Sequence, residues 1–157
     1  MATKILFVCI HNSARSQMAE ALLNKYGGDD FQAYSGGIEP GKLNLYVVKV
    51  LQDDEGIDIS KNIPKSAFEF VKQGILFQYV VTVCDESTAQ KCPIFPGVKQ
   101  RIMMSFEDPS SFTGSDEEII EKVREVKDKI KAEVLHFIAL VQEAKLKENF
   151  PKNWKLG

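Results

Sequence analysis

Residues 5–23 read ILFVCIHNSARSQMAEALL and predict a strand, a short loop and a helix in direct succession. The apolar run at 5–8 is rich in branched and aromatic side chains, as in a buried strand, and residues 17–23 have helical spacing. A loop that opens a helix in this way directs successive backbone N–H groups toward one point, where a tetrahedral oxyanion can bind. This stretch therefore predicts an α/β fold with an anion site at the end of its first strand.

Three side chains at this loop are of the types that a nucleophilic reaction on a bound anion requires. Cys9 ends the strand, and Arg15 can hold two oxygens of an anion with its planar guanidinium. The same positive field favours a thiolate nucleophile, to which Ser16 can donate a hydrogen bond. The spacing alone is a weak signal, and a buried, inert cysteine is the alternative, but the flanking strand and helix favour the nucleophile. The candidate oxyanion-binding loop consists of Ile10, His11, Asn12, Ser13, Ala14, Arg15 and Ser16.

The composition is that of an ordinary globular protein, with 44% hydrophobic and 27% charged residues among 157. A net charge of −2 does not point to nucleic acid or to a membrane surface, and the sequence contains neither a long apolar run nor a signal-peptide pattern. Three cysteines, an odd number, argue against a secreted disulfide scaffold. We therefore expect a cytoplasmic monomer with one catalytic domain at 1–148, a tail at 149–157, and no metal or other cofactor.

Segments typical of strands alternate along the chain with segments typical of helices. The predicted strands are 4–8, 31–35, 79–84 and 99–106, and the predicted helices are 13–26, 44–55, 64–73 and 115–147. The last of these is either one long helix or two nearly collinear ones. The alternation predicts a three-layer α/β/α fold in which helices flank a central four-stranded parallel sheet. In such sheets, ligands bind beyond the carboxyl ends of the strands.

Two further cysteines lie in the middle of the chain. Cys84 ends the strand predicted at 79–84, and Cys92 follows it. If the strands that end at Cys9 and Cys84 are neighbours, about 4.8 Å apart, both sulfur atoms face the same crevice. Eight residues of intact helix would separate Cys84 from Cys92 by about 12 Å, so a disulfide between them requires a looped or unwound segment. Two unrelated thiols are the alternative.

Asp108 and Pro109 follow the last predicted strand. A carboxylate at this position would lie over the same crevice and could donate a proton to a departing oxygen. The sequence leaves an alternative of similar weight, in which the pair only forms a turn.

Together these motifs resemble those of a known family. The motifs that resemble the low-molecular-weight protein tyrosine phosphatase fold are Cys9-x5-Arg15-Ser16 near the start and Asp108-Pro109 late in the chain. Within that fold, the two later cysteines and residues 12–20, NSARSQMAE, are similar to the thioredoxin-coupled arsenate reductases. The similarity extends from residue 4 to residue 141, and the motifs occur in the same order.

The resemblance implies arsenate reduction by three cysteines. Cys9 would attack arsenate held by the loop amides and Arg15, while Asp108 protonates the leaving hydroxide. Cys84 would then attack Cys9, which releases arsenite and forms a Cys9–Cys84 disulfide. Cys92 would next attack Cys84, and thioredoxin would reduce the resulting Cys84–Cys92 disulfide.

Two features depart from the family pattern. Seven residues separate the two later cysteines, one more than the resemblance leads us to expect. The best-known reductases also bind a cation near the loop; Asn12, Glu20 and Ser35 match three of its ligands, whereas Lys65 or a neighbour replaces the expected aspartate. We expect the lysine ammonium to take the place of a potassium ion.

Two other functions compete with arsenate reduction. A tyrosine phosphatase would use the same Cys9, Arg15 and Asp108, but aromatic residues usually follow its Asp-Pro pair, whereas Ser110 and Ser111 follow here. A non-enzymatic redox sensor would bind phosphate and signal through a disulfide between the later cysteines. The sensor predicts slow turnover with any oxyanion.

Overall fold

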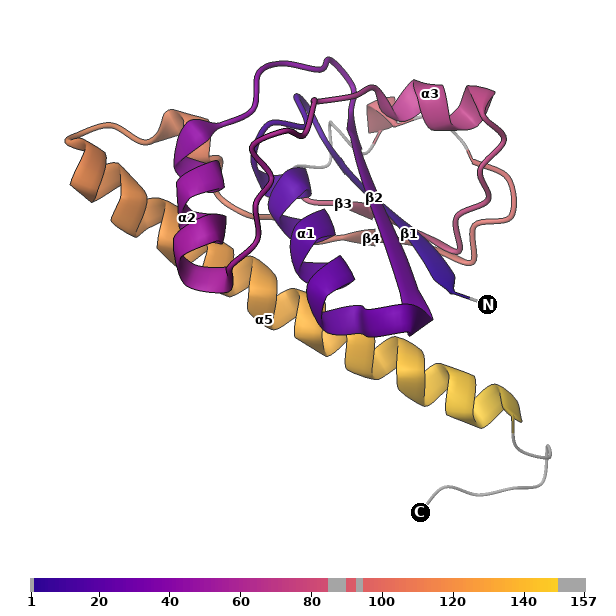
Figure 1. Ribbon diagram of the computed structural model, residues 1–157. Coiled ribbons are helices and arrows are strands. Elements are labelled where there is room, and N and C mark those ends of the chain that lie inside the picture. The colour runs from indigo at the N-terminus through magenta and orange to yellow at the C-terminus, as the bar shows by residue number, and fades with distance from the viewer. Residues whose placement is uncertain (1, 85–89, 93–94, 150–157) are drawn as a thin grey trace.

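The computed structural model describes residues 2–84, 90–92 and 95–149, and it confirms the predicted α/β fold (Figure 1). Four parallel strands form one sheet in the order β2-β1-β3-β4. The strands are β1 (Thr3–Cys9), β2 (Phe31–Gly37), β3 (Tyr79–Thr82) and β4 (Gln100–Met103). The helices are α1 (Arg15–Gly27), α2 (Leu45–Glu55), α3 (Ala67–Lys72) and α5 (Asp116–Asn149), with short 3-10 turns η1 (Gly28–Asp30) and η2 (Pro109–Ser111). Of the tail predicted at 149–157, Asn149 is instead the last residue of α5, and residues 150–157 lie outside the described residues.

Helices cover both faces of the sheet, so the central strand β1 is buried on both sides, whereas the edge strand β4 is largely exposed. Because successive side chains of a strand point to opposite faces, the residues of β1 divide between two apolar layers. Ile5 and Phe7 pack with α1, α2 and α5 in what we call the α1-side layer. Leu6 and Val8 pack with Phe70 of α3 in what we call the α3-side layer. Cys9 and Cys84 lie in the α1-side layer, whereas Cys92 lies in the α3-side layer.

The structure corrects the bounds of several predicted elements. Of the strand predicted at 99–106, only 100–103 joins the sheet as β4. The helix predicted at 64–73 begins at Ala67 rather than near Pro64, because Ser66 caps it by accepting a hydrogen bond from the N–H of Phe68 at 3.2 Å. The helix predicted at 115–147 is one helix of 34 residues, α5.

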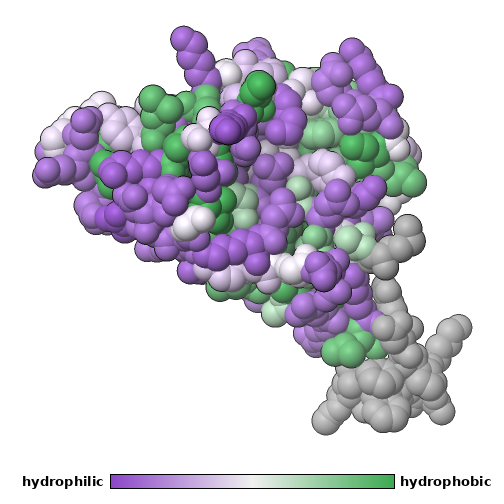
Figure 2. Space-filling model, in the orientation of Figure 1, coloured by the Kyte–Doolittle hydropathy of each residue, from purple (hydrophilic) through white to green (hydrophobic). Residues whose placement is uncertain are grey.

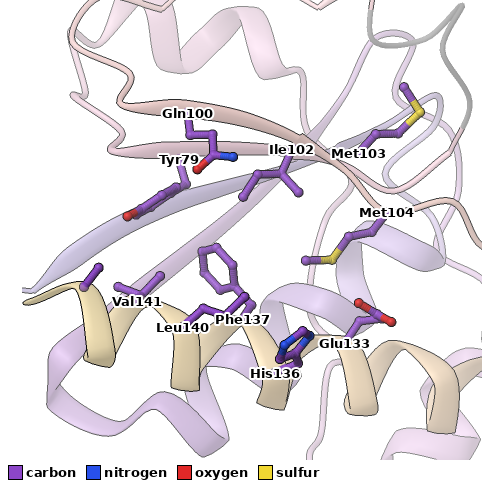
Figure 3. Close-up of a pocket in the computed structure, with 11 residues that line it drawn as sticks. Tyr79, Gln100, Ile102, Met103, Met104, Glu133, His136, Phe137, Leu140 and Val141 are labelled. Carbon is purple, nitrogen blue, oxygen red and sulfur yellow. The ribbon is translucent and has the colours of Figure 1, made fainter. Parts of the chain in front are cut away.

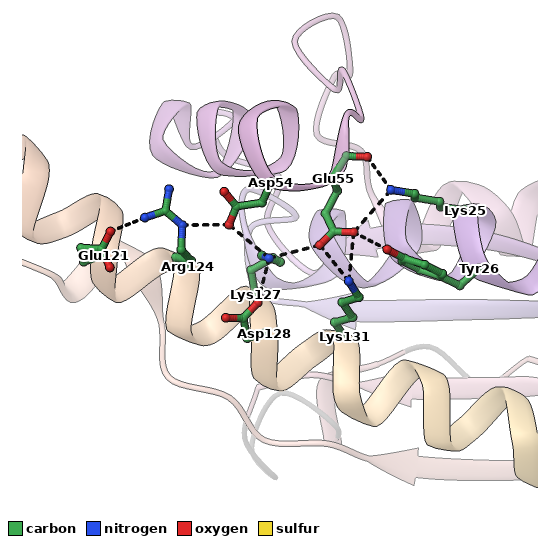
Figure 4. Close-up of polar contacts among 9 residues, drawn as sticks. All are labelled: Lys25, Tyr26, Asp54, Glu55, Glu121, Arg124, Lys127, Asp128 and Lys131. Atoms are coloured by element: carbon green, nitrogen blue, oxygen red, sulfur yellow. Dashed lines mark hydrogen bonds and ion pairs between the residues drawn. The ribbon is translucent and has the colours of Figure 1, made fainter.

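A buried ionic cluster joins α1, α2 and α5 (Figure 4). The side chain of Glu55, at the end of α2, is only 2% exposed and contacts Lys127 at 3.1 Å and Lys131 at 3.2 Å. It also accepts a hydrogen bond from the Tyr26 hydroxyl. Burial by itself would raise the pKa of Glu55, but the hydrogen bonds from Tyr26, Lys127 and Lys131 outweigh it and lower the pKa to about 2. The cluster holds the helices of the α1-side layer together.

The surface in Figure 2 is mainly hydrophilic, with apolar side chains scattered among charged ones. In the described part of the chain, no helix combines the length and the apolar character that crossing a membrane requires.

Candidate active site

The loop between β1 and α1 turns its backbone N–H groups toward the end of β1. Residues 38–44 occupy the opposite side of the loop, and their N–H groups donate to its carbonyls: Ile38 to Cys9 at 3.1 Å, Glu39 to Ile10 at 2.8 Å, Gly41 to His11 at 2.9 Å and Asn44 to Ser13 at 2.9 Å. The C=O and N–H of one trans peptide point in opposite directions. The loop N–H groups that follow these carbonyls therefore face away from residues 38–44 and toward a common centre.

The first turn of α1 contributes further donors to this centre. The helix begins at Arg15 after Ala14, and within the described residues no side chain caps this end. The first N–H groups of a helix have no partner inside the helix, and they carry the positive end of its dipole. Loop and helix start together form a cradle for a tetrahedral oxyanion.

The end of β2 must be glycine for the loop to pack this closely. Gly37 pairs with Cys9 in the sheet. A Cβ atom at Gly37 would lie 2.8 Å from the carbonyl oxygen of Ile10 and 2.9 Å from the backbone nitrogen of Asn12. Backbone atoms at that distance cannot yield without displacing the loop, so a side chain at position 37 would disrupt the cradle.

Asn12 stabilises the unusual conformation of the loop. It has φ of 53°, a left-handed conformation that few residues other than glycine adopt. Its buried side-chain amide makes four hydrogen bonds. The Nδ2 group donates to Ser16 Oγ and Ser35 Oγ, both at 2.9 Å. The Oδ1 atom accepts from the backbone N–H of Lys65 at 3.0 Å and from Gln17 Nε2 at 3.1 Å. These bonds satisfy the whole amide and hold the turn in place.

Cys9 lies in this loop with two donors on its sulfur. It is 3% exposed, and its Sγ atom lies 2.8 Å from Ser16 Oγ and 3.1 Å from the backbone N–H of Asn12. The Ser16 hydroxyl oxygen already accepts a bond from Asn12, so its own hydrogen can point to the sulfur. Donors that converge in this way stabilise negative charge on the attacking atom.

Arg15 connects the loop to the segment that follows β4. Its side chain is 10% exposed; Nη1 donates to the carbonyl of Phe106 at 3.1 Å, and Nη2 lies 3.5 Å from Asp108 Oδ2. The other carboxylate oxygen of Asp108 accepts the N–H of Ser110 at 3.0 Å and caps η2. Asp108 therefore forms the predicted turn and also faces Arg15, and its role as a proton donor stays a prediction.

Cys84 lies beside the loop because β3 is the direct neighbour of β1. The Cys84 thiol donates to the carbonyl of Val8 at 3.7 Å, which places it next to the residue before Cys9. Cys9 and Cys84 both belong to the α1-side layer. The structure thus brings these two cysteines together at the carboxyl end of the sheet.

Cys92 lies apart from the other two cysteines. It is 8% exposed and packs in the α3-side layer with Val8, Phe77 and Phe95. All three cysteines are free thiols. Burial raises the pKa of the Cys92 thiol, and the positive charge and hydrogen bond of Arg101 offset part of this effect. Residues 85–89, which link Cys84 to Cys92, lie outside the described residues.

The residues that resemble a cation site do not fit a bound cation. The amide oxygen of Asn12 already accepts two hydrogen bonds, and its amide nitrogen, not an oxygen, faces Ser35. Burial raises the pKa of Glu20, while the positive charge of Lys65 and a hydrogen bond from Ser35 act in the opposite direction. Lys65 therefore supplies the positive charge beside Glu20.

We expect the protein to show no specific stabilisation by potassium. At equal ionic strength, its melting temperature in KCl and in NaCl should agree within about 1 °C, because a cation would compete with the Lys65 ammonium. A saturated potassium site would add about 2.7 kcal/mol at 100 times its dissociation constant and raise the melting temperature by several degrees. Such a rise, seen in KCl only, would contradict the assignment.

A separate pocket of about 380 Å³ lies between α5 and the β3–β4 side of the sheet (Figure 3). Tyr79, Ile102, Met104 and Phe137 are among its lining residues. Neither a cysteine nor any residue of the oxyanion-binding loop lines it. The pocket is therefore distinct from the candidate active site.

Sequence reasoning missed three parts of the site. Gln17, which is fully buried, braces Asn12 and accepts a hydrogen bond from Asn62 at 3.0 Å. Gly37 permits the close approach of the loop, and the Gly-Gly pair after the strand at 31–35 was the available signal. Arg101 contacts Cys92 only through tertiary structure.

Comparison with known proteins identifies the family. Residues 4–149 match the family described as low molecular weight phosphotyrosine protein phosphatase. An arsenate reductase of Halalkalibacterium halodurans is 40% identical over 126 residues, which cover 80% of this chain and 88% of that protein. The arsenate reductase of Bacillus subtilis is 38% identical over 133 residues, 83% of this chain and 91% of that protein.

A solved thioredoxin-dependent arsenate reductase of Corynebacterium glutamicum superposes with a TM-score of 0.60 at 29% identity. The alignment covers 89% of this chain but only 63% of that chain, so the present protein spans less than two thirds of it. The family match covers nearly the whole chain, and the arsenate reductases of Halalkalibacterium halodurans and Bacillus subtilis are 38–40% identical to it. This chain therefore belongs to the low molecular weight phosphotyrosine protein phosphatase family.

Proposed function

We propose that this chain reduces arsenate to arsenite, with Cys9, Cys84 and then Cys92 as the reacting thiols. The observation that carries the proposal is the pairing of β1 with β3, which puts Cys84 next to the anion loop of Cys9. A phosphatase needs only one nucleophilic thiol. Reduction of arsenate needs a second thiol, because two thiols together supply the two electrons that arsenic gains and are themselves oxidised to a disulfide. The relatives named arsenate reductases support this choice of substrate.

The first step is attack on arsenic. The loop N–H groups and Arg15 hold the oxyanion, and the thiolate of Cys9 forms a bond from sulfur to arsenic. An arsenic–oxygen bond breaks, and Asp108, which lies 3.5 Å from Arg15, donates the proton of its carboxyl group to the departing hydroxide, so that water leaves and Asp108 becomes a carboxylate. Arsenic is still As(V) after this step.

The second step transfers the electrons. The thiolate of Cys84 attacks Cys9 Sγ, which forms the Cys9–Cys84 disulfide and breaks the sulfur–arsenic bond. The electron pair of that bond stays on arsenic, which becomes As(III) and departs as arsenite. The proton of the Cys84 thiol is lost before the attack, and the two sulfur atoms are together oxidised by two electrons.

The third step moves the disulfide to where a protein reductant can reach it. The thiolate of Cys92 attacks Cys84 Sγ, forms the Cys84–Cys92 disulfide and releases Cys9 as a thiolate. Cys92 is buried in the α3-side layer and Cys84 in the α1-side layer, so the two sulfur atoms must approach each other before they react. Thioredoxin is the proposed reductant, a choice supported by the thioredoxin-dependent reductase of similar fold.

Serine variants of the two later cysteines test the proposal. With thioredoxin, thioredoxin reductase and NADPH, arsenate should drive rapid NADPH oxidation by the wild-type protein. Cys84→Ser should stall after one attack, and Cys92→Ser should accumulate the Cys9–Cys84 disulfide, which mass spectrometry of tryptic peptides detects. Hydrolysis of p-nitrophenyl phosphate, measured in parallel, should change by no more than about twofold, because it requires neither residue.

Each competing function predicts a different pattern. Rapid ester hydrolysis without arsenate-coupled NADPH oxidation would identify a phosphatase. Slow turnover with both substrates, together with a change in partner binding on oxidation, would identify a redox sensor. Thioredoxin-coupled turnover that persists in Cys84→Ser would overturn the thiol relay.

A further inference from the structure

We propose that Arg101 is a positioning residue for Cys92, which it holds in the α3-side layer and favours as a thiolate for attack on the Cys9–Cys84 disulfide. The inference rests on the proposed arsenate reduction and adds a residue to its third step. It depends on the register of the sheet, on a direct contact and on the chemistry of a buried thiol.

The register of the sheet directs Arg101 toward Cys92. Leu6 of β1 pairs with Val80 of β3, and Val80 pairs with Arg101 of β4. Residues paired across neighbouring strands project to the same face of a sheet. Leu6 and Val80 belong to the α3-side layer, which also contains Cys92. Arg101 therefore projects from β4, at the edge of the sheet, toward the layer in which Cys92 is buried.

The contact between Arg101 and Cys92 is direct. The Arg101 side chain forms a hydrogen bond with the Cys92 thiol, and its charge opposes the effect of burial on the pKa of this thiol. Tyr34 also packs against the layer, with its ring against Phe70 and Phe77. The charged groups of α3 are exposed and pair with each other, Lys72 with Glu69 at 3.4 Å. Arg101 is itself exposed, so its side chain contacts the Cys92 thiol from the surface side of the layer.

In the proposed reaction, this contact favours the reactive form of Cys92. The thiolate, not the thiol, attacks a disulfide, and an apolar environment disfavours the thiolate. In the proposed step, Cys92 gives its proton to solvent and forms a bond to Cys84 Sγ, while the Cys9–Cys84 bond breaks. Cys9 departs as a thiolate that Ser16 and the N–H of Asn12 receive. A disulfide is exchanged, so no further oxidant or reductant is needed.

The test measures the protonation of Cys92 without using arsenate. In a Cys9→Ser/Cys84→Ser protein, the rate of Cys92 alkylation by iodoacetamide is followed against pH. The midpoint of the alkylation rate against pH should rise by about one pH unit in Arg101→Gln, which removes the charge. Arg101→Lys, which keeps the charge, should reverse at least half of that rise. A role confined to packing would change the plateau rate and leave the midpoint in place.

Lys91 provides the matched control. It is exposed and adjacent to Cys92 in sequence, so Lys91→Gln removes the same charge without removing the hydrogen bond. Arg101 is exposed as well, so the hydrogen bond to Cys92 is what distinguishes it from Lys91. The midpoint for Lys91→Gln should move by no more than about 0.3 unit, since a solvent-exposed charge that does not contact the thiol is screened. An unchanged midpoint in Arg101→Gln, or an equal shift in Lys91→Gln, would overturn the inference.

The same variant has a kinetic consequence in the protein with all three cysteines. A tenfold smaller thiolate fraction is partly offset by greater nucleophilicity, so Arg101→Gln should slow formation of the Cys84–Cys92 disulfide about threefold. Arsenite release, which precedes this step, should keep its single-turnover rate; a threefold loss of that rate instead would place Arg101 elsewhere in the reaction. If the wild-type protein fails to reduce arsenate, the proposed function fails, and the alkylation midpoint still decides the role of Arg101.

Discussion

Arg15→Ala should lower kcat/KM for arsenate by at least about a thousandfold, because it removes the guanidinium beside the proposed oxyanion cradle. The Arg15 side chain is 10% exposed and is held by the carbonyl of Phe106 at 3.1 Å. Its planar group is thus oriented before the substrate binds, and a smaller side chain cannot replace its two parallel hydrogen bonds. Steady-state assays with arsenate measure the loss directly.

Arg15→Lys separates charge from geometry. The lysine keeps the positive charge but cannot bind two oxygens in a plane, so it should recover only a minor part of the activity. Competition by phosphate should weaken in parallel in both variants, since phosphate occupies the same cradle. An Arg15→Ala protein that folds normally and keeps more than a tenth of wild-type activity would contradict this assignment of the anion site.

The second large effect concerns stability. Glu55→Gln should reduce the free energy of unfolding at neutral pH by about 3 kcal/mol, because it removes the buried carboxylate whose pKa the fold lowers from 4.5 to about 2. Lys127 loses this partner but keeps Asp54 at 3.1 Å and Asp128 at 2.7 Å. For a protein of this size, a reduction of about 3 kcal/mol lowers the melting temperature by about 6–12 °C. Asp53→Asn is the matched control on the same helix, since Asp53 is exposed and pairs with Lys49 at 2.9 Å on the surface. Its effect should stay below about 0.5 kcal/mol.

The effect of Glu55→Gln should depend on pH with a defined sign. The pKa of Glu55 is lowered to about 2 in the folded protein, below its ordinary value of 4.5. A carboxylate whose pKa is lower in the folded than in the unfolded protein stabilises the fold fully at pH values above its unfolded-state pKa. This stabilisation is lost as the pH falls toward the folded-state pKa. Denaturation curves should therefore show the full difference in free energy of unfolding between the wild-type protein and Glu55→Gln at pH 7. This difference should shrink as the pH falls from 4.5 to about 2. A difference that stays constant over this range would show that packing, not charge, causes it.

Much of the fold could be predicted because its signals are local. The strand at β1, the loop and α1 follow from the hydrophobic pattern of residues 5–23, and the helix in α5 follows from one long apolar stripe. The bounds were less predictable where a single hydrogen bond decides them, as at Ser66, which caps α3. The strand predicted at 99–106 was too long, because the chain leaves the sheet after Met103 and passes Arg15.

The sequence by itself determined the strand–loop–helix unit and the candidate oxyanion-binding loop within it, since the spacing of Cys9 and Arg15 is a property of consecutive residues. The tertiary structure alone decided how the remaining groups meet. The strand order puts Cys84 beside Cys9, and the register directs Arg101 toward Cys92 in the opposite layer. Strand order and register depend on packing between segments far apart in the chain, and no local pattern of residues contains that information.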